Sequence, residues 1–144
     1  MIELRQALQK DNEFVYSLKK KTIKEYVSKK WGWDEKWQRE YHSQKFEPEL
    51  LKIIKKKGKD IGCISIIKEE NRFFLSIIEI LPEYQNQGIG MDLITNLLAK
   101  ADKNEKDVNL QVLISNEKAQ KLYTRLGFRI EEKTDTHYKM VYSS

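Results

Sequence analysis

The feature that most constrains the fold is a strand-like segment that passes through a glycine-containing turn directly into an amphipathic helix. The apolar run Phe73–Ile80 precedes Pro82, which lacks the N–H group that a strand ladder needs. Beyond the turn, one face of the expected helix is apolar and consists of Ile89, Leu93, Ile94, Leu97, Leu98 and Ala101. This arrangement predicts a mixed α/β domain.

The periodicity of the remaining sequence predicts the other elements. Helices are expected over Asp11–Lys29, from the N-cap candidate Asp34 to about Gln44, and from Ala119 to Leu126 ahead of Gly127. Strand-like runs are Ile2–Arg5, Leu50–Lys56, Asp60–Lys68, Val108–Ile114, Phe128–Lys133 and His137–Tyr142. The expected order is β-α-α-β-β-β-α-β-α-β-β. The 144 residues contain no repeat or linker, so a single domain over residues 1–144 is expected.

The charge of the chain suggests a polyanionic partner. The formal net charge is +5 and the sequence pI is near 9.1, with lysines concentrated within residues 19–24 and 55–59. These lysines are either solvated faces or attract a nucleic acid or a phosphate-rich cofactor. No RNA-recognition or zinc-finger signature is present, so no nucleic-acid partner is expected.

Cysteine content and hydropathy bear on the compartment. Cys63 is the only cysteine, which excludes an internal disulfide and fits a reducing cytoplasm. It lies in an apolar alternating run, which favours a buried, inert thiol over a nucleophile. No apolar run approaches the ~20 residues that span a bilayer, and the first residues lack the layout of a signal peptide. We therefore expect a cytoplasmic protein without membrane association.

The turn Gln85–Gly90 has the pattern Gln-x-x-Gly-x-Gly and is a candidate phosphate site. A helix start carries unpaired N–H donors and a partial positive charge, which favour a phosphate group. Gly88 and Gly90 allow the backbone to approach the anion closely, and successive N–H groups can converge on a pyrophosphate without a lysine. The alternative is a tight turn that binds nothing. The lysine of a Walker P-loop and the glycine spacing of a dinucleotide fold are both absent.

A second motif lies downstream, at Asn116–Phe128, and reads Asn-x-x-Ala-x-x-Leu-Tyr-x-x-x-Gly-Phe. Asn116 is expected to cap a helix that follows a buried strand. Ala119, Leu122 and Tyr123 lie three or four positions apart and so share one face of that helix. Taken alone, this spacing is typical of a core aromatic residue at Tyr123.

Together, the two motifs resemble those of the GNAT superfamily of acyl-CoA N-acyltransferases, over about Phe73–Phe128. The resemblance implies a GNAT-like central sheet, mixed and largely antiparallel, flanked by helices. It also implies an N-acetyltransferase that uses acetyl-CoA as co-substrate and moves the acetyl group to a primary amine by direct attack in a ternary complex. A non-catalytic acyl-CoA-binding or sensor domain of the same fold is the alternative.

The resemblance further implies roles for individual residues. The backbone at the end of the strand would pair with the pantetheine arm, at Ile78, Glu79 and Ile80. The pyrophosphate would be held by Asn86, Gln87, Gly88, Ile89, Gly90 and Met91. Asn116 would contact the cofactor near its thioester. Tyr123 would be the general acid, because a phenol with a reference pKa of ~10 can protonate a thiolate as charge builds on sulfur.

One position departs from the family pattern. Some members carry a glutamate base on the strand before the asparagine, where this chain has Gln111, which cannot take a proton. Glu79, at the end of its strand, is the leading candidate for the general base; the alternative is an ordinary solvent-facing residue. The remaining options are His42, His137, Tyr138 or loss of the proton to solvent. With so few soft ligands in the chain, no metal site is expected.

An aromatic segment falls where the first two helices of the family form one wall of the acceptor site. Its tryptophans are Trp31, Trp33 and Trp37, followed by Tyr41 and His42. They either form an aromatic lip for the substrate amine or pack one helix on the sheet. The sequence leaves the acceptor open between small molecules and proteins, and it leaves a homodimer open as well.

Overall fold

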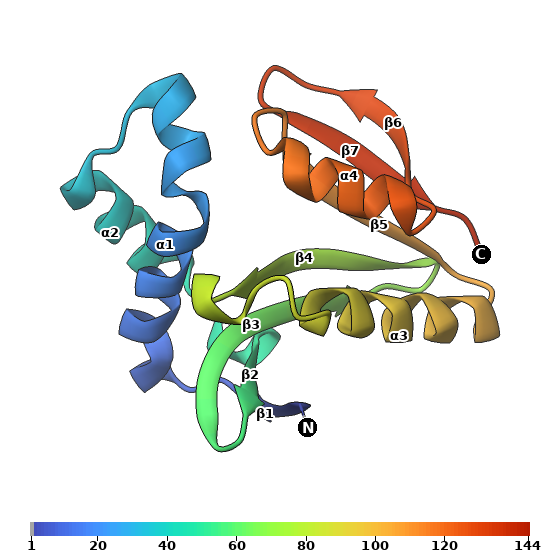
Figure 1. The fold of residues 1–144 in the computed structure, drawn as a ribbon, viewed down its shortest axis with the longest axis horizontal. Coiled ribbons are helices and arrows are strands. Elements are labelled where there is room, and N and C mark those ends of the chain that lie inside the picture. The colour runs from blue at the N-terminus through green and yellow to red at the C-terminus, as the bar shows by residue number, and fades with distance from the viewer. Residues whose placement is uncertain (1) are drawn as a thin grey trace. The chain divides into compact units, whose positions relative to one another are not determined.

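The computed structural model describes residues 2–144, apart from the side chain of Lys30. Figure 1 shows the four α-helices among these residues, which are α1 (Asn12–Trp31), α2 (Glu35–Lys45), α3 (Ile89–Lys103) and α4 (Glu117–Arg125). The strands are β1 (Ile2–Gln6), β2 (Lys52–Lys56), β3 (Lys59–Lys68), β4 (Arg72–Ile80), β5 (Asp107–Leu113), β6 (Arg129–Lys133) and β7 (His137–Tyr142). The predicted order of helices and strands is confirmed.

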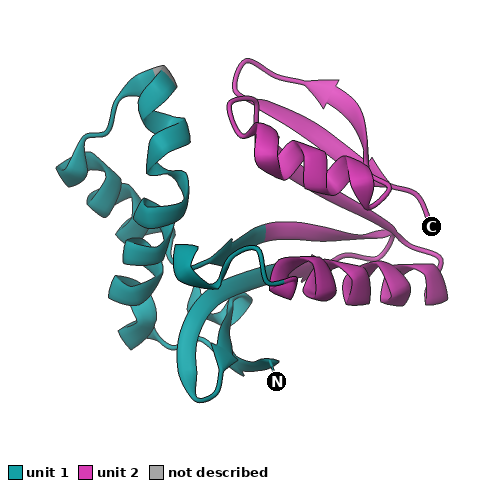
Figure 2. Cartoon of the chain, in the orientation of Figure 1, with its two compact units in different colours: residues 1–65, 77–87 teal, residues 66–76, 88–144 magenta. Residues whose placement is uncertain are grey.

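The strands form a seven-stranded sheet in the order β1-β2-β3-β4-β5-β7-β6. The chain divides into two compact units (Figure 2). Unit 1 consists of the residues up to Ser65 together with Ile77–Gln87, and unit 2 of Ile66–Ser76 and Gly88–Ser144. β3 and β4 therefore each run from one unit into the other. The prediction of a single domain stays a prediction.

In unit 1, β2 pairs antiparallel with both β1 and β3, and helix α1 packs against β2 and β3. The packing follows from an apolar cluster contributed by the helix, the strands and the segments that join them. This cluster consists of Ala7, Val15, Leu18, Leu51, Ile53 and Cys63. Because Leu18 is fully buried in it, the neighbouring positions on α1, Lys19 and Thr22, lie at the edge of this core.

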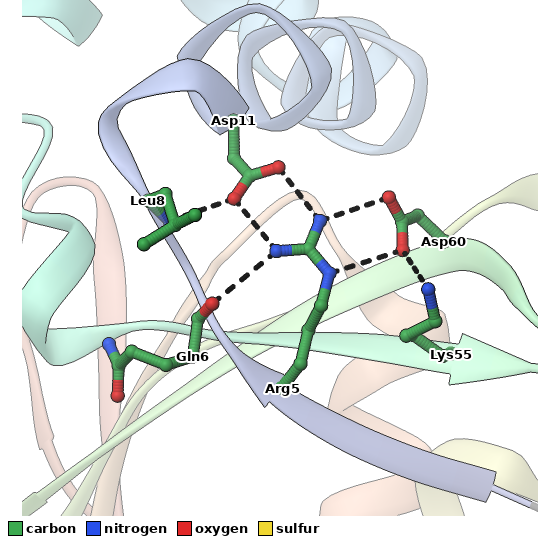
Figure 3. Close-up of polar contacts among 6 residues, drawn as sticks. All are labelled: Arg5, Gln6, Leu8, Asp11, Lys55 and Asp60. Atoms are coloured by element: carbon green, nitrogen blue, oxygen red, sulfur yellow. Dashed lines mark hydrogen bonds and ion pairs between the residues drawn. The ribbon is translucent and has the colours of Figure 1, made fainter.

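An ionic network in unit 1 fixes the chain between β1 and α1 (Figure 3). The Arg5 guanidinium donates to both carboxylate oxygens of Asp11, at 2.8 and 3.0 Å, and to Asp60 on β3 at 3.0 Å. Asp11 is buried and also accepts from the backbone N–H of Leu8, at 2.8 Å. The hydrogen bonds from Arg5 hold the pKa of Asp11 and of Asp60 below their usual values. Paired and hydrogen-bonded in this way, the buried carboxylate anchors the start of α1.

In unit 2, β4 and β5 pair in parallel, from Arg72↔Asp107 to Leu75↔Leu110. β7 pairs antiparallel with both β5 and β6. The predicted apolar face of α3 is largely buried, at Ile89, Ile94, Leu97, Leu98 and Ala101. The hydroxyl of Tyr142 on β7 donates to Asp102 on α3 at 3.0 Å, which fastens the helix to the sheet. The prediction of a mixed, largely antiparallel sheet with helices is confirmed.

The differences from the expected boundaries have local causes. Leu50 was expected in a strand, but it lies in a 3-10 turn that begins at Pro48, because the proline ring fixes a turn-like φ. α1 runs to Trp31 and stops at Gly32, whose φ is 75°. Asp34 caps α2 as predicted and accepts from the N–H of Trp37 at 3.0 Å. In the described part of the chain, no helix is both long and apolar enough to cross a membrane.

Candidate active site

The turn that follows β4 is held by side-chain hydrogen bonds within unit 1. A 3-10 turn (Pro82–Tyr84) leads into it, and the Gln85 amide donates back to the Ile80 carbonyl at 2.9 Å. Asn86 has a φ of 62°, in the left-handed region. The Gln87 amide donates to the Glu83 carbonyl at 3.2 Å and accepts from the Lys56 ammonium at 2.9 Å. The conformation of this turn is therefore stabilised by the protein's own hydrogen bonds, without a ligand.

The start of α3, in unit 2, presents free backbone donors. The first hydrogen bond of the helix runs from the N–H of Asp92 to the carbonyl of Gly88, at 2.9 Å. The N–H groups of Ile89, Gly90 and Met91 precede it, and the helix has no side-chain cap. These donors and the partial positive charge of the helix start suit an anion. Gly88 has a φ of 83°, and its conformation rather than a lack of space calls for glycine, because a Cβ there would meet nothing within 4 Å.

The backbone of β4 is partly used at the residues predicted to pair with a pantetheine arm. The parallel pairing with β5 ends at Leu75, before the strand ends at Ile80. Ile78 lies beyond the last of these pairs, whereas the Ile80 carbonyl already accepts from Gln85. A Cβ on Gly62 of β3 would collide with the carbonyl oxygen of Glu79. β3 therefore approaches β4 closely at this point.

Glu79 lies in a small polar cluster within unit 1. One carboxylate oxygen accepts from the Thr22 hydroxyl of α1 at 3.2 Å, and the other lies 3.9 Å from the Cys63 thiol of β3. Burial raises the pKa of Glu79 to about 7, against the smaller opposing effects of Thr22, Lys19 and Cys63. Glu79 is thus partly buried and hydrogen-bonded to a neighbouring helix, and its role as the general base stays a prediction. A carboxyl group with a pKa near 7 is divided between its two protonation states at neutral pH.

Tyr123 lies on α4 in unit 2, and Asn116 directly precedes that helix. The Tyr123 ring packs edge-to-face on Phe128 with the ring centres 5.7 Å apart, and burial raises the pKa of its phenol to about 12. The Tyr123 hydroxyl has no hydrogen-bond partner among the described residues. Since none of these residues has a fully buried side-chain polar atom without a partner, the Tyr123 oxygen is not completely buried. Asn116 caps α4 by accepting from the N–H of Ala119 at 3.1 Å. Its amide N–H₂ group is thus the part left for a ligand.

Gln111 and the remaining options for the general base have different environments. Gln111 is exposed on β5, opposite Lys139. His42 is buried, its Nε2 lies 3.3 Å from the Asn12 carbonyl, and burial lowers its pKa. His137 Nδ1 lies 2.6 Å from the Thr136 hydroxyl, and burial lowers its pKa as well. For Tyr138, the structure shows only the Lys133 ammonium, 5.9 Å from the ring centre.

The aromatic segment separates into two groups. Trp37 and Tyr41 stack at 5.0 Å and are 55% and 41% exposed. His42 instead faces the interior, between Tyr16 and Phe46. Trp33 donates from its indole N–H to Glu35 at 3.3 Å, which ties the start of α2 to its preceding loop. Trp31 is likewise 54% exposed, so the predicted aromatic lip is best matched by Trp31, Trp37 and Tyr41.

Three residues around these groups were missed by the sequence reasoning. Thr22 and Lys19 touch or face Glu79, and Lys56 contacts Gln87. Helical spacing could have placed Thr22 and Lys19 on one face of α1, because they are three positions apart. No local signal pairs them with Glu79. Among the residues that the structure describes, no group of three His, Cys, Asp or Glu side chains is placed to hold a metal.

The chain belongs to the acetyltransferase (GNAT) family, whose family pattern matches residues 10–128. N-alpha-acetyltransferase MAK3 of Arabidopsis thaliana is 30% identical to it over 96 residues, which cover 63% of this chain and 50% of that protein. The chain thus spans about half the length of this curated relative. The prediction of a GNAT-type N-acetyltransferase is confirmed at the level of the family.

Solved structures share the fold over the full chain. PaiA N-acetyltransferase from Thermoplasma acidophilum, solved in complex with coenzyme A, has a TM-score of 0.80 at 19% identity, over 100% of this chain and 99% of that one. Naa50 of Arabidopsis thaliana, solved with the bisubstrate analogue CoA-Ac-MVNAL, has a TM-score of 0.65 at 21% identity, over 99% of each chain. At these identities the likeness shows the fold alone.

Proposed function

We propose that this protein is an acetyl-CoA-dependent N-acetyltransferase that acetylates a primary amine by direct attack in a ternary complex. The family match over residues 10–128, which includes both motifs, carries this proposal. The coenzyme A complex of the Thermoplasma relative supports acetyl-CoA as the co-substrate. We place the activity in the cytoplasm, without a nucleic-acid partner or a metal, and leave the homodimer open.

The proposed cofactor site follows the two motifs. The free N–H groups at Gly90 and its neighbours Ile89 and Met91 bind the pyrophosphate, together with the turn from Asn86 to Gly88. The backbone of Ile78 to Ile80 pairs with the pantetheine arm. Asn116 donates from its free amide group near the thioester, since its oxygen already caps α4. Lys56, beside Gln87, adds a positive charge to this turn.

The proposed reaction assigns one proton transfer to each of two residues. The amine nitrogen attacks the thioester carbonyl carbon, the new C–N bond forms and the C–S bond breaks. Glu79 takes the proton that the amine loses, and Tyr123 protonates the departing sulfur. A base with a pKa of about 7 is better matched to this task than an ordinary carboxylate with a reference pKa of ~4.3.

The acceptor that we propose is the α-amino group of a peptide or protein. The Arabidopsis relatives are an N-alpha-acetyltransferase and a protein solved with a peptide-containing bisubstrate analogue. The pKa values of the possible acceptor amines support the same choice. An α-ammonium has a reference pKa of ~8 and a lysine side chain ~10.4, so transfer to Glu79 is far less uphill from the former.

The central test is ligand-dependent stability. Acetyl-CoA should raise the free energy of unfolding by ~2.7 kcal/mol at about a hundredfold excess over its Kd. Differential scanning fluorimetry with acetyl-CoA, and with ATP as a matched polyanion, separates specific binding from simple attraction to a basic chain. A melting temperature that responds equally to both ligands, or to neither, would contradict the proposal. Binding of acetyl-CoA without thiol release from any amine would instead favour the non-catalytic sensor.

Replacing Gly90 by alanine should raise the stability of the protein while weakening its binding of CoA. Gly90 lies within the first turn of α3 and is not among the glycines with positive φ, so Gly90→Ala should stabilise the helix by about 0.5–1 kcal/mol. The added Cβ should obstruct the pyrophosphate and weaken CoA binding by about tenfold, roughly one lost charge-assisted hydrogen bond. Calorimetric titration and thermal melts measure the two effects.

Asn96→Ala is the matched control for Gly90→Ala. Asn96 is exposed on the same helix and away from the turn, so alanine there should raise stability while leaving CoA affinity unchanged. If Gly90→Ala binds CoA as tightly as this control does, the pyrophosphate does not lie on the start of α3.

A further inference from the structure

The carboxylate of Glu79 is held at both oxygens by unit 1. Oε2 accepts from the Thr22 hydroxyl of α1 at 3.2 Å, and Oε1 lies 3.9 Å from the Cys63 thiol of β3. A surface glutamate has no need of partners on two different elements. A carboxyl group that exchanges a proton at one defined position needs such partners, because it must keep the same orientation in its ionised and protonated forms.

The Thr22 hydroxyl can serve both protonation states of Glu79. It lies 3.0 Å from the Leu18 carbonyl and 3.3 Å from the Lys19 carbonyl, as well as beside Glu79. A hydroxyl has one proton to donate and two lone pairs that accept. It can donate to the ionised carboxylate of Glu79. When Glu79 is protonated, the hydroxyl can turn its own proton to the Leu18 carbonyl and accept from the acid.

Lys19 supplies the charge that faces Glu79 from the same helix. It lies three positions before Thr22, and its ammonium is 5.5 Å from the centre of the Tyr41 ring. Lys19 is half-buried, it has no ion pair among the described residues, and burial lowers its pKa. Its positive charge favours the ionised form of Glu79.

Cys63 is the other titratable group in the cluster. Its thiol is fully buried, and burial raises its pKa well above the usual value. The thiol therefore stays neutral and acts as a weak donor, without adding a second negative charge beside Glu79. Among the described residues, the charged and titratable groups that face Glu79 are thus Lys19 from α1 and Cys63 from β3.

We propose that Thr22 and Lys19 are positioning residues for Glu79: the Thr22 hydroxyl orients the carboxyl group in both protonation states, and the Lys19 ammonium favours its ionised form. This inference rests on the proposed role of Glu79 as the general base. The competing explanation is that Thr22 only returns a hydrogen bond to its own helix, as threonines often do. In that case its loss would change stability and nothing else.

The first experiment is a titration that needs neither cofactor nor acceptor. In protein labelled with ¹³C at the glutamate carboxyl carbons, the resonance of Glu79 is identified by its absence in Glu79→Gln. Wild type should titrate near pH 7, and Thr22→Val and Lys19→Met should each move the midpoint upward by about half a unit or more, because each loses a group that favours the ionised form. Thr22→Ser and Lys19→Arg, which keep the hydroxyl and the charge, should return it to the wild-type value.

The second experiment is the pH–rate profile of the same variants. The acidic limb of turnover should move to higher pH in Thr22→Val and Lys19→Met, in step with the measured midpoints, with Thr22→Ser matching wild type. Unchanged midpoints in properly folded Thr22→Val and Lys19→Met would overturn the inference. If the midpoints move as expected but Glu79→Gln keeps full turnover, then the cluster stands and the assignment of Glu79 as base is what fails.

Discussion

Glu79→Gln is expected to lower turnover at pH 7 by about 10²-fold, because the amide cannot accept the proton of the acceptor amine. Wild-type turnover should rise with pH through about 7, as Glu79 loses its own proton. In the variant this limb should disappear. Turnover should then recover only as alkaline solution deprotonates the amine, near pH ~8 for an α-amino group. Steady-state rates between pH 6 and 9.5 measure both profiles.

Stability supplies an independent check on Glu79→Gln. The raised pKa means that the folded state holds this proton more tightly than the unfolded state does. Wild-type stability therefore falls as the pH rises from about 4.5 through about 7, and glutamine removes that loss. The variant should melt no lower than wild type at pH 8. Glu70→Gln, a matched change at an exposed site, should keep wild-type rates; a wild-type profile in Glu79→Gln would eliminate this base.

Removing the hydroxyl of Tyr123 should have the other large effect. Tyr123→Phe is expected to lower turnover by about 10- to 10²-fold, with CoA affinity nearly unchanged. The loss lies at the lower end for an acid catalyst because the pKa of Tyr123 is raised to about 12, whereas a thiol has a reference value of ~8.5. Complete proton transfer from Tyr123 to the thiolate is thus uphill. The Tyr123 hydroxyl helps chiefly by donating a hydrogen bond to the sulfur as negative charge develops on it.

The matched control for Tyr123 is Tyr142→Phe in the same unit. Its hydroxyl donates to Asp102, so the control should lose stability and keep its turnover. Rapid-quench or thiol-release assays at saturating cofactor compare the two variants. If Tyr123→Phe keeps the wild-type rate, the hydroxyl has no part in the reaction, and the ring is then a packing residue against Phe128.

Much of the fold could be predicted because its signals are local. The apolar stripe of α3, the cap at Asp34 and the glycine that ends α4 each report on neighbouring residues of the chain. The errors arose where one residue overrides a longer pattern. Pro48 turned the start of an expected strand into a 3-10 turn, although the run that followed it was suitably apolar.

The candidate site was predictable to a lesser degree, since its motifs are local but its environments are not. The turn at Gly88 and the free N–H groups at the start of α3 were predicted from the short pattern Gln-x-x-Gly-x-Gly. The cluster around Glu79 instead joins residues that lie 57 positions apart for Thr22 and 16 apart for Cys63. The sequence alone left Glu79 between a general base and an ordinary solvent-facing residue. Only tertiary packing brings it to a threonine and raises its pKa.

The close approach of β3 to β4 has a consequence for reading variants of this chain. Gly62 lies far outside both motifs, and any side chain there would press on the carbonyl oxygen of Glu79. Such a change would shift the peptide that carries the carboxylate while leaving every motif residue intact. A variant altered only at Gly62 would thus keep both motifs unchanged while its proposed base, Glu79, is displaced.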